Sequence, residues 1–133
     1  MFTYNQFSGR LTGTVRDAIF DYFGYSGCGD GKNNPAMQDA ADVGPLPCGL
    51  YTIELIADAN GNPIDYEHKK APVFRLVPDS TNEMFGRSGF LIHGDSIAEP
   101  GTASHGCMIE NKAVRELILD AVRDGNNRLE VRP

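Results

Sequence analysis

The sequence of 133 residues contains no run of about 18 consecutive apolar residues, so we expect no membrane-spanning helix. Basic residues are also scarce: 12 Lys and Arg stand against 18 Asp and Glu, which gives a formal net charge of −6. A chain this acidic is a poor candidate for binding nucleic acid or an anionic membrane surface. The N-terminal segment has no basic start followed by an apolar stretch, which predicts synthesis in the cytoplasm without a signal peptide.

Cysteine is rare as well, with three residues at wide spacing. Cys28, Cys48 and Cys107 are too few and too far apart for the disulfide framework of a small secreted domain. A bridge between Cys28 and Cys48 would close a long loop, and the alternative is two separate small thiols. In either case at least one thiol is left over. The Cys and His residues show no paired short spacing of the kind that binds zinc, so we expect no metal site.

Complete nucleotide and calcium motifs are also absent. The glycine-rich segment 26–33 lacks the first Gly and the final Ser or Thr of a phosphate-binding loop. The segment 58–69 lacks the central Gly and the closing Glu of a calcium-binding loop, and its beginning is better explained as a turn. We therefore expect no cofactor, and we interpret His68, Lys69 and Lys70 as solvated surface residues.

What the chain does contain is typical of a turn-rich β domain, because 15 Gly and 8 Pro interrupt short alternating segments. The expected strands cover residues 2–15 as a hairpin, 18–25 as a buried strand, 50–57, 73–77, 90–93 and 128–132. One helix is expected over 111–124, because its apolar residues recur at helical spacing and Asn111 and Gly125 suit its two ends. The prediction is a mainly β fold, a β-rich α+β domain with one helix in the C-terminal half, in a single domain over 1–133.

One segment combines the residues that could carry chemistry. A predicted strand ends at His93, a loop follows, and the chain then makes a tight turn over Ser104-His105-Gly106-Cys107. A loop of this length can fold back and place Cys107 beside His93, where the imidazole would activate the thiol as a nucleophile. Gly106 would let the backbone approach a substrate, and its N–H, with that of Cys107, would form an oxyanion hole. The alternative is a small buried thiol and a histidine that satisfies a local hydrogen bond.

The pattern of His-Gly, a loop and Ser-His-Gly-Cys resembles the active-site signature of the L,D-transpeptidase (YkuD-like) family. Over nearly the whole chain the sequence is similar to a smaller branch, the L,D-transpeptidase-like effectors of type VI secretion. The resemblance is carried by Gly24-Tyr-Ser-Gly27, Lys32-Asn-Asn-Pro-Ala36, Val43-Gly-Pro-Leu-Pro47, Gly49-Leu-Tyr-Thr-Ile53, Phe85-Gly-Arg-Ser-Gly-Phe-Leu-Ile-His-Gly-Asp95, Ala103-Ser-His-Gly-Cys107, Val114-Arg115 and Arg128-Leu-Glu-Val131. It implies a compact β-sandwich or barrel that acts on peptidoglycan stem peptides.

The resemblance also implies a set of catalytic roles. Cys107 would attack the carbonyl that joins the L-centre of diaminopimelate to the terminal D-alanine, with His93 as the base. The third member in this family is a backbone carbonyl, here that of Gly94, and Asp95 is the alternative group that would orient the histidine. The resulting thioester would be resolved by water, by a free D-amino acid or by a second stem peptide.

Three further residues are expected to support the substrate. Ser104 and His105 belong to the signature and should shape the turn or contact the peptide. Arg87 is a candidate for pairing a substrate carboxylate, since a guanidinium fork matches a carboxylate, and the alternative is a surface ion pair. Two departures from the family bear on the acceptor: the loop after His93 is short, and Met108-Ile109-Glu110 replaces the usual polar or basic residue two places after the cysteine.

Two other classes of protein compete with this interpretation. Papain-like and NlpC-type hydrolases place Cys before His, and sortases keep the two much further apart, so the order disfavours another thiol peptidase. The second rival is a non-enzymatic peptidoglycan-binding or phage-related structural module. A peptidoglycan enzyme made without a signal peptide implies export by another machine. We therefore expect a monomeric, type VI secreted antibacterial toxin with a carrier and a cognate immunity protein, acting in the periplasm of a target bacterium.

Overall fold

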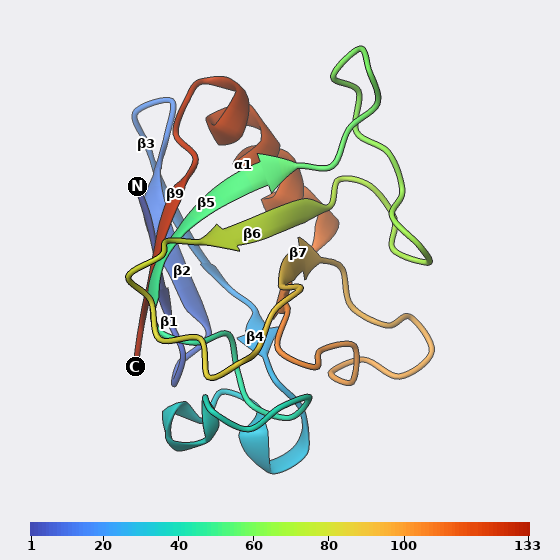
Figure 1. Ribbon diagram of the computed structural model, residues 1–133. Helices are drawn as coiled ribbons and strands as arrows, with labels where there is room; N and C mark the ends of the chain where they lie inside the picture. The colour runs from blue at the N-terminus through green and yellow to red at the C-terminus, as the bar shows by residue number, and fades with distance from the viewer.

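The computed structural model describes residues 1–133 and contains nine strands, two short 3-10 helices and one α-helix (Figure 1). The strands are β1 (Phe2–Asn5), β2 (Arg10–Val15), β3 (Ala18–Phe23), β4 (Tyr25–Ser26), β5 (Gly49–Leu55), β6 (Phe74–Pro78), β7 (Leu91–His93), β8 (Met108–Ile109) and β9 (Arg128–Arg132). The helices are η1 (Gly29–Gly31), η2 (Pro35–Met37) and α1 (Lys112–Arg123). The predicted mainly β fold with one helix in the C-terminal half is confirmed.

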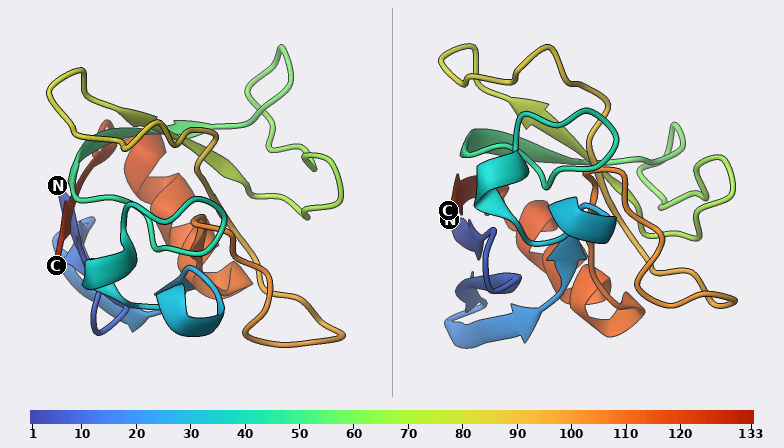
Figure 2. Two further views of the ribbon diagram at one scale, coloured as in Figure 1. Left: turned by 60° about the horizontal axis from the view of Figure 1, so that its bottom comes forward. Right: turned by 90° about the horizontal axis from the view of Figure 1, so that it is seen from below.

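All nine strands belong to one sheet, in the order β3-β2-β1-β9-β5-β6-β7-β8-β4. The two edge strands, β3 and β4, are consecutive in the chain and are joined by Gly24 alone. The sheet therefore curls until its edges nearly meet, and Figure 2 shows its strands curving around α1. Gly24 suits this junction because a Cβ there would collide with the carbonyl oxygen of Ile109 and the carboxylate of Glu110.

The helix α1 packs its apolar side into the curled sheet. Val114, Ile118 and Ala121 are buried, in agreement with the helical spacing of the apolar residues. The side chain of Asn111 accepts a hydrogen bond from the Val114 N–H at 2.9 Å, which satisfies a free donor at the N-terminus. Gly125 follows the helix at φ 87°, the left-handed conformation that glycine adopts without strain. This helix is too short and too polar to cross a membrane.

One strand prediction is wrong in its burial. The segment 18–25 was expected to form one buried strand, but Gly24 divides it into β3 and β4 at opposite edges of the sheet. In β3 only Phe20 is buried, whereas Ile19 is 87% and Phe23 is 66% exposed. The physical reason is position: an edge strand has a neighbour on one side only, so its apolar residues are covered by fewer partners.

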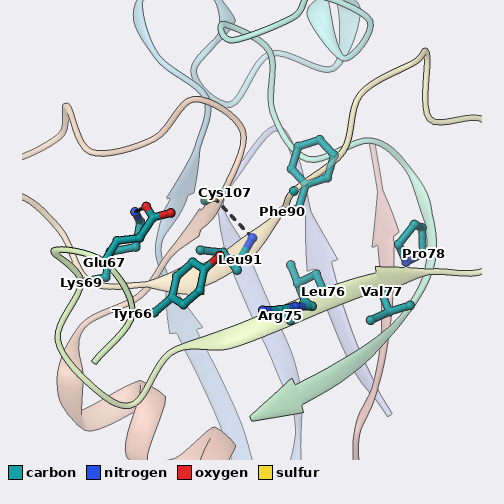
Figure 3. Close-up of a pocket in the computed structure, with 11 residues that line it drawn as sticks. Tyr66, Glu67, Lys69, Arg75, Leu76, Val77, Pro78, Phe90, Leu91 and Cys107 are labelled. Carbon is teal, nitrogen blue, oxygen red and sulfur yellow. Dashed lines mark hydrogen bonds and ion pairs between the residues drawn. The ribbon is translucent and has the colours of Figure 1, made fainter. Parts of the chain in front are cut away.

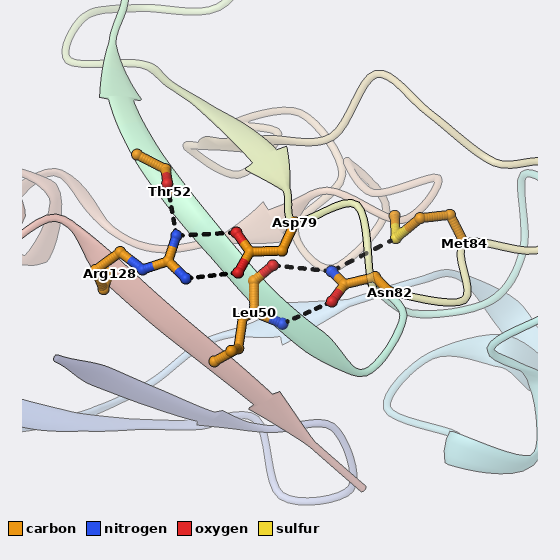
Figure 4. Close-up of polar contacts among 6 residues, drawn as sticks. All are labelled: Leu50, Thr52, Asp79, Asn82, Met84 and Arg128. Carbon is orange, nitrogen blue, oxygen red and sulfur yellow. Dashed lines mark hydrogen bonds and ion pairs between the residues drawn. The ribbon is translucent and has the colours of Figure 1, made fainter.

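A polar cluster fixes the beginning of the segment that leads from β6 to β7 (Figure 4). Arg128 of β9 donates to both carboxylate oxygens of Asp79, at 3.0 and 2.8 Å. The side chain of Asn82 pairs with the main-chain N–H and carbonyl of Leu50 in β5. These contacts tie the connection that carries Arg87 to the central strands β5 and β9, so it leaves the sheet in a defined direction.

Long connections gather beside the end of β7 (Figures 1 and 2). The residues that follow β4 lie alongside the connection from β7 to β8, because Ser26 and Gly27 bond to Gly106 and Ser104. The connection from β5 to β6 projects away from the sheet and carries a turn at 66–69. The loops are therefore placed around β7 and β8, where the candidate site lies.

Candidate active site

The parallel pairing of β7 with β8 brings the two candidate catalytic residues together. Ile92 lies opposite Met108, and His93 lies opposite Ile109. One position earlier, the main-chain N–H of Leu91 donates to Cys107 Sγ at 3.3 Å. Cys107, the residue before β8, and His93, the last residue of β7, are thus diagonal neighbours across this pairing. Adjacent strands of a sheet lie about 5 Å apart. Because side chains alternate between faces, both residues point to the same face of the sheet.

His93 is 4% exposed and is oriented by its own chain neighbour. Its Nδ1 lies 2.8 Å from the carbonyl oxygen of Gly94. A carbonyl can only accept, so Nδ1 carries the hydrogen and Nε2 is left as the acceptor. Burial lowers the pKa of His93, the Gly94 contact partly opposes this, and the charges of Lys69 and Arg115 add to the lowering. The histidine is therefore neutral at neutral pH and able to take up a proton.

Cys107 is partly buried, and its thiol is held by the Leu91 N–H. Burial raises the pKa of Cys107, while the Leu91 hydrogen bond and the charge of Lys69 oppose the rise. The main-chain N–H of Cys107 has no hydrogen-bond partner within the chain, so it remains available to a ligand. Cys28 and Cys48, which the sequence left as either a bridge or separate thiols, are free thiols.

The turn that presents Cys107 is organised by Ser104. Its buried hydroxyl donates to the Cys107 carbonyl at 2.6 Å and accepts from the N–H groups of Gly27 and Gly106. Gly106 adopts φ 133°, and a Cβ there would lie 2.6 Å from Arg87 Nη2. Gly106 was expected to let the backbone approach a substrate; here it packs against Arg87, and its N–H is already bonded to Ser104. Of the two predicted oxyanion donors, the Cys107 N–H is the free one.

Arg87 is placed inside the protein and away from solvent. Its guanidinium donates to the carbonyl oxygens of Gln38, Gly44, Pro45 and His105, at 2.6–3.3 Å. It also lies over the ring of Phe90 at 5.1 Å. These contacts join the segment 38–45 to the turn before Cys107. These contacts favour a structural role for Arg87, in which it holds the loops together. They disfavour the predicted role of pairing with a substrate carboxylate.

Asp95 and His105 make their hydrogen bonds elsewhere and none to the His93 ring. Asp95 accepts hydrogen bonds from the Tyr25 hydroxyl at 2.6 Å and from the N–H groups of Ser96 and Gly101, and these close the loop after β7. Burial raises the pKa of Asp95, but these hydrogen bonds outweigh it and leave the pKa below its ordinary value. His105 is exposed and its Nδ1 lies 3.2 Å from the Asp42 carbonyl. The contact to His93 comes from Gly94 and not from Asp95.

Two hollows flank the Cys107–His93 pair. The first, of about 530 Å³, is lined by Cys107 together with Tyr66, Arg75 and Phe90 among others (Figure 3). We call it the thiol pocket. The second, of about 700 Å³, is lined by His93, Gly94, Asp95, Lys69, Lys70, Lys112 and Arg115 among others. We call it the histidine pocket. Lys69 lines both, so it lies at their junction.

Three residues beside the pair were not predicted from the sequence. Lys69 was interpreted as a solvated surface residue, but it lines both pockets and its side chain is 27% exposed. Arg115 is buried and lines the histidine pocket; its position on the apolar side of the helix was the available signal. Glu110 is buried directly after β8, and no periodicity marks it. His68 and Lys70 are exposed, as expected.

Solved structures similar to this chain include the Ldtfm-avibactam carbamoyl enzyme, with 16% identity, a TM-score of 0.58 and coverage of 99% of this chain and 48% of that chain. A cysteine-to-serine mutant of Enterococcus faecium L,D-transpeptidase has 15% identity, a TM-score of 0.51 and coverage of 98% and 48%. The catalytic domain of the E. faecium L,D-transpeptidase has 17% identity, a TM-score of 0.50 and coverage of 98% and 95%. The chain thus spans about half the length of the first two.

These similarities establish an L,D-transpeptidase-like fold, as the sequence resemblance implied. No curated protein matches the sequence. The family described as the Tlde1 domain matches residues 21–132, which include every strand from β4 to β9, the helix α1, and both His93 and Cys107. The chain therefore belongs to the Tlde1 domain family.

Proposed function

We propose that the protein is a cysteine-dependent L,D-carboxypeptidase or L,D-transpeptidase that acts on the tetrapeptide stems of peptidoglycan. The observation that carries the proposal is the placement of Cys107 and His93 on one face of the sheet, with His93 Nδ1 bonded to the Gly94 carbonyl. Because Nδ1 carries the hydrogen, Nε2 of a neutral imidazole is the nitrogen that could accept the proton of a neighbouring thiol. The L,D-transpeptidase-like fold and the Tlde1 family support this class of substrate.

The first step is acyl transfer to the thiol. His93 Nε2 takes the proton of Cys107, and the sulfur attacks the carbonyl carbon between the L-centre of diaminopimelate and D-alanine. The Cys107 N–H, free of partners within the chain, stabilises the oxygen that becomes negative. The C–N bond then breaks, the imidazolium returns its proton to the leaving nitrogen, and D-alanine and a thioester are formed.

The second step resolves the thioester. An acceptor with an O–H or N–H gives its proton to His93 and attacks the thioester carbonyl. The C–S bond then breaks, and the imidazolium returns the proton to the sulfur of Cys107. Water yields a shortened stem peptide, a free D-amino acid yields an exchanged stem, and the amine of a second stem yields a cross-link. The three products differ in mass, so they also identify the preferred acceptor.

Muropeptide analysis tests this proposal. The change Cys107→Ala removes the nucleophile, so we expect release of D-alanine from tetrapeptide muropeptides to fall to the uncatalysed level. Cys48→Ala removes a free thiol that lines neither pocket, so it is the matched control and should leave release unchanged. Equal muropeptide profiles for wild type and Cys107→Ala would overturn the proposal and favour a binding module.

We further propose that the activity serves a type VI secreted antibacterial toxin, which the family membership supports. In that role the chain acts in the periplasm of a target bacterium and is held inactive in its own cell by an immunity protein. Growth of cells that express wild type or Cys107→Ala tests this role. Export to the periplasm should slow growth for wild type and not for Cys107→Ala; equal growth would contradict the toxin role.

A further inference from the structure

The histidine pocket carries a charge opposite to that of the whole chain. Four of its lining residues are cationic, namely Lys69, Lys70, Lys112 and Arg115, and Asp95 is its one carboxylate. The complete chain has a formal net charge of −6. The oxygens of Asp95 are already occupied by Tyr25, Ser96 and Gly101. Lys70 and Lys112 pair with carboxylates outside the lining, namely Asp65 at 3.4 Å and Glu116 at 4.0 Å. The hollow of about 700 Å³ beside His93 is nevertheless lined by more cations than carboxylates, on an otherwise acidic molecule.

Arg115 is a buried residue that lines this pocket. It is 5% exposed, and its Nε and Nη1 donate to the carbonyl oxygens of Glu110, Lys70 and Pro72. Nη2 has no hydrogen-bond partner within the chain and lies where a Cβ on Gly94 would be 2.8 Å away. The absence of a side chain at Gly94 thus leaves room around this donor. The same arginine anchors the turn that carries Lys69.

Lys69 completes the pocket from the other side. It closes the turn that begins at Tyr66 and lines both the thiol pocket and the histidine pocket. Its one ionic contact is with Glu67 at 3.4 Å, and the Glu67 side chain is 63% exposed. Such an exposed pair is weak, so an incoming carboxylate can replace it. After burial, the charge of Lys69 adds to the lowering of the pKa of His93 and opposes the rise in the pKa of Cys107.

The proposed reaction defines which part of a substrate occupies this pocket. His93 gives its proton to the leaving nitrogen, so the departing amino acid lies on the side of His93 and not in the thiol pocket. A terminal amino acid carries an α-carboxylate two bonds from that nitrogen. A cation in the same hollow as His93, together with a free guanidinium N–H, is the chemistry that recognises a carboxylate.

We propose that Lys69 and Arg115 form a subsite in the histidine pocket for the α-carboxylate of the amino acid that leaves or enters. This inference rests on the proposed function and specifies its substrate class. The enzyme would act on peptide bonds that precede a terminal residue with a free carboxylate. It would discriminate against the same bond when the terminal carboxylate is replaced by an amide.

Kinetics on paired substrates test the subsite. The ratio of kcat/KM for a tetrapeptide with a C-terminal carboxylate to that for its C-terminal amide should be large for wild type. Lys69→Gln should lower this ratio about tenfold, the usual loss for one charge-assisted hydrogen bond. Lys69→Arg should restore it. Arg16→Gln makes the same change of net charge at an exposed pair with Asp120 and Asp124 and should leave the ratio unchanged.

A binding measurement keeps this inference separate from the catalytic proposal. In the Cys107→Ala protein, D-alanine should shift the amide resonance of Gly94 in a saturable NMR titration, and D-alaninamide should not. Lys69→Gln should weaken the D-alanine titration. Equal binding of the two compounds, or an unchanged substrate ratio in Lys69→Gln, would overturn the subsite. The binding result does not depend on whether Cys107 is the nucleophile, so it separates failure of the subsite from failure of the catalytic proposal.

Discussion

At the scale of single residues, burial and one backbone contact decide the protonation of the proposed catalytic pair, Cys107 and His93. Burial raises the pKa of the Cys107 thiol and lowers that of His93, so the resting pair is neutral and not a thiolate–imidazolium ion pair. The Gly94 carbonyl keeps the hydrogen on Nδ1 and directs Nε2 away from the backbone. The proton of the thiol would then move to His93 as the sulfur attacks, and not beforehand.

The pH dependence of activity follows from these directions. Because His93 must be neutral to accept a proton and its pKa is lowered, kcat/KM should be retained as the pH falls below 6.5, the ordinary pKa of histidine. It should decline only at a lower pH, as His93 becomes protonated. A profile of kcat/KM against pH, measured with the C-terminal carboxylate substrate, checks this. An acidic limb centred above pH 6.5 would instead indicate an ion pair.

At the scale of elements, the loops beside the site are held by buried arginines and not by strand pairing. Arg87 binds carbonyl groups of the segment 38–45 and of the turn before Cys107, and Arg115 binds those of the turn that carries Lys69. Each guanidinium has several donors in one plane, so a single side chain can satisfy several carbonyl groups. The position of Cys107 therefore depends on residues in distant parts of the chain.

Arg87→Lys separates the structural role from substrate pairing, because lysine keeps the charge and loses the planar fork. Loss of several buried hydrogen bonds should lower the free energy of unfolding by about 3 kcal/mol in urea denaturation. The exposed Arg10→Lys change, at an ion pair with Asp21, is the control and should have little effect. Unchanged stability together with a raised KM would return Arg87 to the substrate-pairing role expected from the sequence.

At the scale of the whole molecule, closing the sheet places one carboxyl group in the core. Glu110 is 1% exposed, and neither of its carboxylate oxygens has a hydrogen-bond partner. Burial raises the pKa of Glu110 to about 8. The charge of Glu110, after burial itself, also raises the pKa of Tyr4, whose hydroxyl is buried and unpaired as well. The folded protein therefore favours the protonated form of Glu110.

This carboxyl group should make stability depend on pH. The pKa of Glu110 is higher in the folded state than the ordinary 4.5. The stability that the protonated carboxyl group contributes is therefore fully present below about pH 4.5 and is lost as the pH rises to about 8. The free energy of unfolding of wild type should fall across this window, by as much as a few kcal/mol. Glu110→Gln should remove most of the fall, whereas the exposed Glu99→Gln should not. Urea denaturation at several pH values measures the difference, and parallel profiles for wild type and Glu110→Gln would contradict it.

Much of the fold and part of the site can be derived from the sequence. The period of the apolar residues and the caps Asn111 and Gly125 are local signals, and they correctly predict α1. The short alternating segments likewise predict most strands. The order of His93 and Cys107 in one segment identifies the candidate pair, because the intervening loop is short enough to bring them together.

What the sequence by itself determined is thus the set of elements and the candidate pair. The tertiary structure decided that β3 is an exposed edge, that Arg87 is buried among carbonyl groups, and that Lys69 lies between the two pockets. The physical reason is that burial and charge environment depend on which distant segments pack together. Those contacts arise only when the sheet closes, so they cannot be predicted from the local period of apolar residues or from the spacing of motifs.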